Sequence, residues 1–218
     1  MNFQESLQIA LITIAITFLA NLIFHYLKNY FDWFSETKIF KRDHYYSQLK
    51  ELYLELYGVV SQSEFIRYFN DFNEQFSFME LPFLELKNKV MKVVTNIETG
   101  RITREEVDKE TDLTRFNKSH IANLIIEKKQ YASPKLLKLA VAYRFCHEYY
   151  LKEDLSVPSL LEKYQKEELK LMYELVVTII KETNEKLEFC KMDYIEEERE
   201  HGIMDYDIYG EDKFKSSN

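Results

Sequence analysis

Arg115 and His120 are the residues whose types and spacing could perform catalysis in this chain. They form an R-x4-H pattern near the middle of the sequence. An arginine can hold a phosphate group through paired hydrogen bonds, and a histidine can move a proton near neutral pH. The pattern therefore indicates chemistry on a phosphate ester, with Arg115 and His120 as candidate catalytic residues.

The R-x4-H pattern resembles the motif of HEPN ribonucleases, which are all-helical domains in which such a pair supports attack on an RNA phosphate. The resemblance covers this short motif alone and implies an RNA-cleaving activity. In that family the residue after the arginine is usually polar, and here it is Phe116. Because the sequence offers no second supporting cluster, an HEPN-like ribonuclease is a subordinate hypothesis.

The sequence lacks the usual patterns of metal and cofactor sites. His147 and Glu148 begin an H-E pair, but the second histidine of a zinc-binding H-E-x-x-H helix is missing. The five histidines and two cysteines are scattered, and the four glycines form no phosphate-binding loop. We therefore expect no metal ion and no cofactor, and enzymatic activity is not the leading hypothesis.

The segments ITREEVDKETDL and SPKLLKLAVA resemble the opening and the close of the helix-turn-helix in DNA-reading repressor domains. The stretch between them is about three residues too long for that motif and lacks its usual glycine. Residues 101–152 carry 11 basic residues against 7 acidic ones, which is a small positive excess. We therefore expect no nucleic-acid partner.

An apolar stretch near the N-terminus is expected to anchor the rest of the chain at a membrane. Residues 7–27 carry no formal charge and are long enough to cross a bilayer as a helix. A signal peptide would need a basic start and a small-residue cleavage site, and both are missing. The first 27 residues contain no lysine or arginine, whereas basic residues follow. This bias predicts a single-pass protein of the inner (cytoplasmic) membrane, with N-out/C-in topology.

Two groups of residues on this helix have expected roles at the membrane. The aromatic and basic residues expected to anchor it at the interface are Tyr26, Lys28, Tyr30, Trp33, Lys41 and Arg42. The small and polar residues expected on one helix face are Ala10, Thr13, Thr17, Asn21 and His25. Such a face can join helices in lipid. Plain anchoring, with threonines bonded to their own helix, and a polar pore lining are the alternatives.

The rest of the chain predicts an all-α fold. With only 4 glycines and 3 prolines there are few breaks, so the elements should be few and long. We expect the single transmembrane helix to precede a cytoplasmic helical bundle of about five to six helices. The expected segments are a short extracytoplasmic tail (1–6), the transmembrane helix (7–27), a juxtamembrane aromatic and basic collar with a helix (28–57), a cytoplasmic helical domain (58–191) and an acidic tail without fixed structure (192–218).

Several local patterns predict element boundaries. Gly58 should end one helix, and Ser61 with Glu64 should cap the next. A further helix should begin at Pro82 and stop at Gly100. Aromatic residues recur at helical spacing after Ser61 and should pack in the core: Phe65, Phe69, Phe72 and Phe76, with Met79.

The C-terminal half contains two strong helix starts. Ser133 and Pro134 should be the cap and first residue of an enclosed helix. A second helix of about 30 residues should begin near Pro158. Its apolar stripe follows coiled-coil-like steps, so it either packs along the bundle or pairs with a second copy. The stripe consists of Met172, Val176, Ile179, Thr183, Leu187 and Cys190.

Charge and topology together suggest a function in binding. Residues 192–218 carry nine acidic residues against three basic ones, most of the net charge of −8. The leading hypothesis is a membrane-anchored helical interaction module that self-associates or holds a protein partner, with the acidic tail contacting a basic partner. The main alternative is an effector that permeabilises the membrane when it oligomerises, as small bacterial anchored helical proteins can.

Overall fold

The computed structural model describes residues 3–72, 75–87, 89–95, 100–108, 111–150 and 158–204. The described chain is mostly helical, with one two-stranded sheet. It divides into two compact units, Met1–Tyr45 and Tyr46–Asn218. The predicted predominance of helix is therefore confirmed, and the hairpin is an element that the sequence patterns did not predict.

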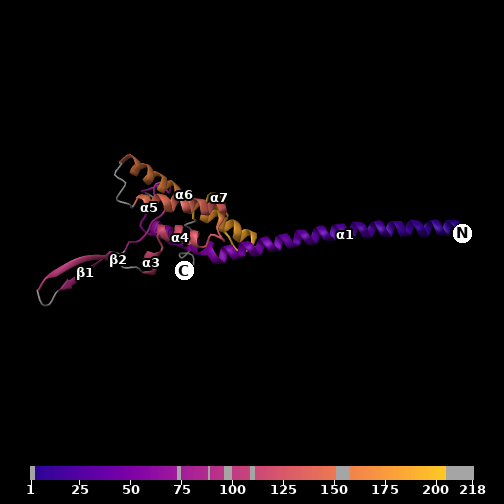
Figure 1. The fold of residues 1–218 in the computed structure, drawn as a ribbon, viewed down its shortest axis with the longest axis horizontal. Helices are drawn as coiled ribbons and strands as arrows, with labels where there is room; N and C mark the ends of the chain where they lie inside the picture. The colour runs from indigo at the N-terminus through magenta and orange to yellow at the C-terminus, as the bar shows by residue number, and fades with distance from the viewer. Residues whose placement is uncertain are drawn as a thin grey trace, which may run out of the picture. The chain divides into compact units, whose positions relative to one another are not determined.

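Helix α1 (Phe3–Gln48) is 46 residues long and is drawn as one uninterrupted helix in Figure 1. No glycine or proline interrupts the sequence here, so nothing in the covalent chain stops the helix. It contains a segment that is long and apolar enough to cross a membrane, and none of that apolar window is buried.

The helical path continues through a π-helical turn, η1 (Leu49–Tyr53), into α2 (Leu54–Phe69). The predicted helix end at Gly58 is wrong, because α2 runs through it. An isolated glycine is tolerated inside a helix, and the buried neighbours Leu56 and Val59 hold this one in place. The predicted capping box is also wrong, since the Ser61 hydroxyl donates to the Tyr57 carbonyl at 2.8 Å inside the helix.

The predicted aromatic core stripe after Ser61 is wrong. Phe69 is 73% exposed and Met79 is 66% exposed, and Phe65 and Phe76 are also exposed. Since α2 ends at Phe69, the later residues of the stripe do not continue on the same helix face. The face of α2 that is buried in this region carries Ser63, Glu64 and Arg67 instead.

The helix predicted between Pro82 and Gly100 is wrong, because its second half contains strand β1 (Lys89–Thr95). This strand pairs antiparallel with β2 (Ile102–Asp108), which lies after Gly100. The register places Val93 opposite Arg104 and Val94 opposite Thr103. Valine-rich segments fit strands, and Gly100 adopts a positive φ of 64°, which suits a turn. Figure 1 shows the two strands side by side.

The later helices of the second unit are α3 (Asp112–Arg115), α4 (Lys118–Glu127), α5 (Pro134–Tyr150), α6 (Pro158–Phe189) and α7 (Glu196–His201). The core residues come mainly from η1, α2, α4, α5 and α6. Helix α5 packs against both α4 and α6. The predicted start of α5 is confirmed, because the Ser133 hydroxyl oxygen accepts from the Leu136 amide at 3.1 Å. The predicted start of a long helix at Pro158 is also confirmed.

The apolar stripe of α6 packs inside the second unit. Met172, Val176 and Ile179 are at most 2% exposed, and Thr183 is fully buried. Of the two alternatives for this stripe, packing along the bundle is therefore the one observed. Because its central residues are already covered by the same chain, this stripe is not free to pair with a second copy.

The first part of the acidic tail is ordered, contrary to expectation. The Glu198 carboxylate is buried and accepts hydrogen bonds from the Tyr57 hydroxyl at 2.7 Å and the Asn184 amide at 2.9 Å. These bonds hold α7 against α2 and α6. A carboxylate can be buried when polar partners bond it, and the partners of Glu198 lie on other helices, so the acidic composition alone did not predict this order. The rest of the tail, residues 205–218, lies outside the described residues.

Candidate functional site

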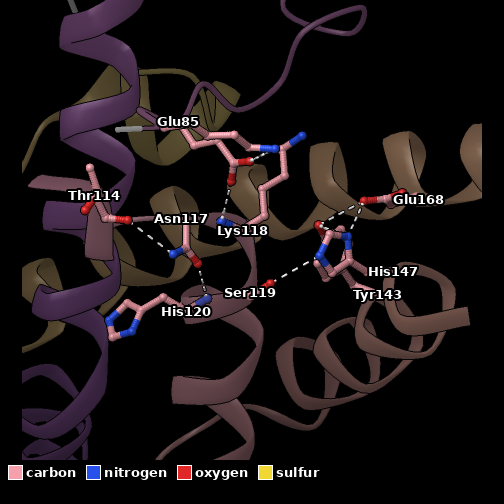
Figure 2. Close-up of polar contacts among 10 residues, drawn as sticks. Glu85, Thr114, Asn117, Lys118, Ser119, His120, Tyr143, His147 and Glu168 are labelled. Carbon is pink, nitrogen blue, oxygen red and sulfur yellow. Dashed lines mark hydrogen bonds and ion pairs between the residues drawn. The ribbon is translucent and has the colours of Figure 1, made fainter. Parts of the chain in front are cut away.

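His147 on α5 joins three helices through the two nitrogens of its ring. Its Nδ1 lies 2.8 Å from Oε1 of Glu168 on α6, and its Nε2 lies 3.2 Å from Oγ of Ser119 on α4. Figure 2 shows the imidazole between the hydroxyl and the carboxylate. We call these three residues the Ser119–His147–Glu168 cluster.

Tyr143 supports the carboxylate side of the cluster from one turn earlier on α5. Its ring stacks on the His147 ring with the centroids 5.5 Å apart, and its hydroxyl donates to Glu168 Oε1 at 3.1 Å. Burial, followed by the negative charge of Glu168, raises the pKa of Tyr143, so the phenol remains a hydrogen-bond donor. Tyr143 therefore fixes both the ring plane of His147 and the position of the carboxylate.

Glu168 is held in its charged form. The hydrogen bond from His147 is the largest cause that lowers its carboxyl pKa, against burial, which raises it. The Tyr143 hydroxyl and the charge of Lys118 lower the pKa further, as does the charge of His147 when its ring is protonated. A charged carboxylate only accepts hydrogen bonds, so the Nδ1 atom of a neutral His147 must carry the proton. Its Nε2 lone pair then faces the Ser119 hydroxyl.

The first turn of α4 brings Ser119 to this position. Asn117 caps the helix, since its side-chain oxygen accepts from the His120 amide at 2.8 Å. The Lys118 amide donates to the Glu85 carboxylate at 3.1 Å, which ties the same turn to the segment before β1. Ser119 is exposed, whereas His147 and Glu168 are about three-quarters or more buried. The hydroxyl can therefore be reached from solvent while its partners are held.

A cavity of about 320 Å³ adjoins the cluster, with His147 and Glu168 in its wall. Its apolar wall includes Phe83, Leu169 and Met172, and its charged rim includes Lys118 and Glu85. Ligand sites commonly combine apolar walls with a few placed polar groups, as this cavity does. His147 and Glu168 line the cavity, and Ser119 does not. In chemical terms, the arrangement can take a proton from Ser119, and the cavity that borders His147 could accept a small apolar group.

The structure does not bring together the two residues that the sequence singled out for catalysis. Arg115 lies on α3, is well exposed, and has Asp112 as its acidic neighbour at 3.9 Å. His120 lies on α4 with its Nε2 3.7 Å from a Glu55 carboxylate oxygen. Among the described residues, no contact joins the Arg115 guanidinium to the His120 imidazole.

The residues predicted to act at a membrane all lie on α1. Thr13, Thr17, Asn21 and His25 are exposed, and Thr13, Thr17 and Asn21 line a groove with Ile14 and Phe18. Ala10 belongs to the same helix, but its side chain lies outside the described residues. The predicted anchors are exposed as well: Tyr26, Lys28, Tyr30, Trp33, Lys41 and Arg42.

Sequence patterns did not reveal Ser119 or Glu168 as partners of His147. The hydroxyl partner lies 28 positions from His147 and the carboxylate partner 21 positions from it. No short motif records such separations. The one usable signal is His147 itself, a histidine in a strongly apolar helical segment, and with Glu148 it forms only an incomplete zinc motif.

No protein-family model, curated protein or solved structure matches this chain.

Proposed function

We propose that this chain is a single-pass inner-membrane protein, N-out/C-in, whose helical second unit acts in the cytoplasm as an interaction module and self-associates. The observation that carries the proposal is the complete exposure of the apolar window of α1. An exposed apolar surface of this length needs lipid or another protein to cover it.

Residues that flank the apolar window support a membrane boundary. Tyr26 and Trp33 are exposed aromatic residues, as expected for side chains at the headgroup level. Basic residues accompany them, since the Lys38 ammonium lies 4.3 Å from the Phe34 ring centre and Lys41 lies 5.3 Å from that of Tyr45. Because these basic residues lie on the C-terminal side of the apolar window, they favour a cytoplasmic position for the second unit.

Asn21 is the residue best placed to drive self-association. The Thr17 hydroxyl donates to the Thr13 carbonyl of its own helix at 2.8 Å, so its proton is already used. The Asn21 amide is exposed and has no hydrogen-bond partner within the described part of the chain. In hydrocarbon an unpaired amide is costly, and a second helix laid in the groove beside Thr13 and Thr17 could supply the partner.

A protein partner of basic charge is proposed for the acidic end of the chain. Glu196, Glu197 and Glu200 on α7 are exposed. Arg199 of this helix pairs with Glu188 at 2.5 Å and also with Glu196, so Glu197 and Glu200 carry the negative charge that Arg199 does not offset. The exposed face of α7 therefore presents negative charge, which would favour association with a basic surface.

Reporter fusions test the proposed orientation. A fluorescent protein joined after Asn218 should fluoresce, whereas alkaline phosphatase joined at the same place should be inactive, because that enzyme requires export. Phosphatase activity without fluorescence would contradict the C-in orientation. Release of the whole protein from membranes by carbonate would contradict the span itself.

Cross-linking in native membranes tests self-association. Wild type should form a dimer or larger species, and Asn21→Leu should reduce it at least about three-fold, since such a bond contributes roughly 0.6–2 kcal/mol in membranes. Ile23→Leu, on another face of α1, is the matched control and should not change the yield. A wild type that remains monomeric at every concentration would refute self-association. Depolarisation of expressing cells would instead favour the permeabilising alternative.

A further inference from the structure

We propose that the Ser119–His147–Glu168 cluster is a catalytic site that cleaves esters by acyl transfer to the Ser119 hydroxyl. Its residues stand in the order nucleophile, base and orienting carboxylate that defines serine hydrolases on unrelated folds. The Ser119 to His147 distance of 3.2 Å and the His147 to Glu168 distance of 2.8 Å meet the geometric requirement for an activated nucleophile. The proposal is independent of the membrane function.

The direction of proton transfer follows from the hydrogen bonds. Charged Glu168 accepts from Nδ1–H of His147 and from the Tyr143 hydroxyl, which leaves Nε2 of a neutral imidazole as an acceptor. The Ser119 hydroxyl lies 3.2 Å from Nε2 and can donate to it. The imidazole is therefore oriented to remove the serine proton, and the carboxylate stabilises the imidazolium that forms.

The amide of Ser119 can stabilise the negative oxygen of the intermediate. The first amides of a helix have no partners within the helix. Here the Lys118 amide donates to Glu85 and the His120 amide donates to Asn117. For the Ser119 amide, the described part of the chain shows no acceptor. A carbon bound to Ser119 Oγ would hold its oxyanion near that amide, as the nucleophile's own amide does in other serine hydrolases.

The adjoining cavity indicates the substrate class. Its volume of about 320 Å³ and the apolar side chains of Phe83, Leu169 and Met172 suit a short aliphatic acyl chain. Ser119 does not line this cavity but its partner His147 does, so an acyl chain on Ser119 would extend past the imidazole to reach it. Ser119 is exposed, so the alcohol part of an ester can remain in solvent. The site should therefore prefer esters of short aliphatic acids to esters with long chains.

The reaction requires only ester and water. Ser119 Oγ bonds to the ester carbonyl carbon while its proton passes to His147 Nε2. The carbon–oxygen bond to the alcohol then breaks, and the alcohol leaves with that proton. Water attacks the acyl-serine, giving one proton to His147, and the carboxylic acid departs as the proton returns to Ser119 Oγ. Atoms balance and no oxidant or reductant takes part.

Hydrolysis of p-nitrophenyl butyrate by the full chain in detergent micelles tests the proposal. Wild type should hydrolyse it, and Ser119→Ala should lower kcat/KM roughly 100-fold or more. His147→Gln should have a similar effect. Ser61→Ala is the matched control, because Ser61 is a helical serine whose hydroxyl bonds only its own helix, and its rate should equal that of wild type.

Labelling with a fluorophosphonate gives a second readout that a structural role would not produce. The probe should modify Ser119 in wild type, as located by mass spectrometry of peptides, and should fail to label the His147→Gln protein. Because Ser119 is exposed, Ser119→Ala should fold like wild type, so this variant alone is decisive. Equal hydrolysis by wild type and Ser119→Ala, or no labelling of Ser119, would overturn the proposal and leave the cluster as a structural link.

Discussion

Buried charged and polar side chains hold the second unit together at specific points. Glu168 bonds His147 and Tyr143, and Glu198 bonds Tyr57 and Asn184. Each carboxylate accepts from neutral or weakly basic donors on other turns or other helices. Removing one donor would leave a buried acceptor without a partner. This lowers the free energy of unfolding by more than the average contribution of one hydrogen bond. For Glu168, whose carboxyl pKa is lowered in the fold, stability should therefore depend on ionisation.

The lowered pKa of Glu168 predicts a pH dependence. A carboxyl whose pKa is lower in the folded chain stabilises the fold above its ordinary value of 4.5, and that contribution is lost as pH falls through the folded value. At pH 7, Glu168→Gln should lower the free energy of unfolding by about 1–2 kcal/mol. The difference from wild type should shrink at pH 3. Urea unfolding followed by tyrosine circular dichroism measures both, and an equal difference at the two pH values would contradict this role.

Local spacing explains what the sequence could and could not predict about single residues. Arg115 and His120 form a motif because they are close in sequence. In the fold, however, Arg115 pairs with Asp112 and His120 lies beside Glu55. Ser119 stands next to His120 in sequence, but its relevant partner is His147 on another helix. Such pairs arise from the packing of α4, α5 and α6, which periodicity alone does not place.

Two glycines in helical segments have opposite structural roles. Gly202 ends α7 at a φ of 72°, and an added Cβ would lie 2.6 Å from Cγ1 of Val177. Gly58 lies inside α2, where an added Cβ would meet nothing within 4 Å. The first glycine is therefore required by backbone and packing, and the second only weakens its helix.

Alanine at these two positions should change stability in opposite directions. Gly202→Ala should destabilise the second unit by about 1–3 kcal/mol, from the left-handed backbone and the close contact. Gly58→Ala should stabilise it by roughly 0.5–1 kcal/mol. Thermal unfolding of the two variants beside wild type provides the measurement. A destabilising Gly58→Ala would show that α2 does not run through this position in solution.

Substitutions on the exposed face of α2 should change the free energy of unfolding much less than substitutions on its buried face. Leu56 is fully buried, so Leu56→Ala should lower the free energy of unfolding by about 2–5 kcal/mol. Phe69 is 73% exposed, so Phe69→Ser should change it by no more than about 0.5 kcal/mol. Urea unfolding of both variants measures the contrast. A large loss at Phe69 would restore the original interpretation of the aromatic stripe as core.

Element boundaries were predictable where a side chain sets them directly. Ser133 and Pro134 mark the start of α5 because one supplies an acceptor and the other needs no amide partner. The hairpin was missed because valines at helical spacing also fit a strand, and the choice depends on pairing with a later segment. The order in α7 was missed because the partners of Glu198 lie on α2 and α6.

At the scale of the whole molecule, the division after Tyr45 separates exposed apolar surface from packed core. Every buried core residue from Leu49 to Met204 belongs to the second unit, whereas the described side chains of α1 before Tyr45 are exposed. The two units therefore place different demands on their surroundings. The first unit needs lipid or another protein against its apolar surface, whereas the second unit has a hydrophobic core of its own.

Removal of residues 1–45 should leave a folded protein in solution. The shortened chain keeps the buried residues of the core, so its circular dichroism should remain helical and its unfolding cooperative. It should appear in the supernatant after membranes are sedimented, whereas the full chain should sediment with them. A shortened chain that aggregates would show that the exposed surface of the second unit also needs a covering.

The bond between Tyr57 and Glu198 joins positions 141 residues apart in the sequence. During synthesis the ribosome makes α2 long before α7, and translation proceeds at about 5–20 residues per second. At that rate, about 7–28 seconds separate the synthesis of Tyr57 from that of Glu198, whereas roughly 1–3 seconds separate Asn184 from Glu198. The nascent chain thus cannot close its second unit until Met204, which is 5% exposed, has left the exit tunnel. Helix α7 is therefore the last described helix that can join the second unit.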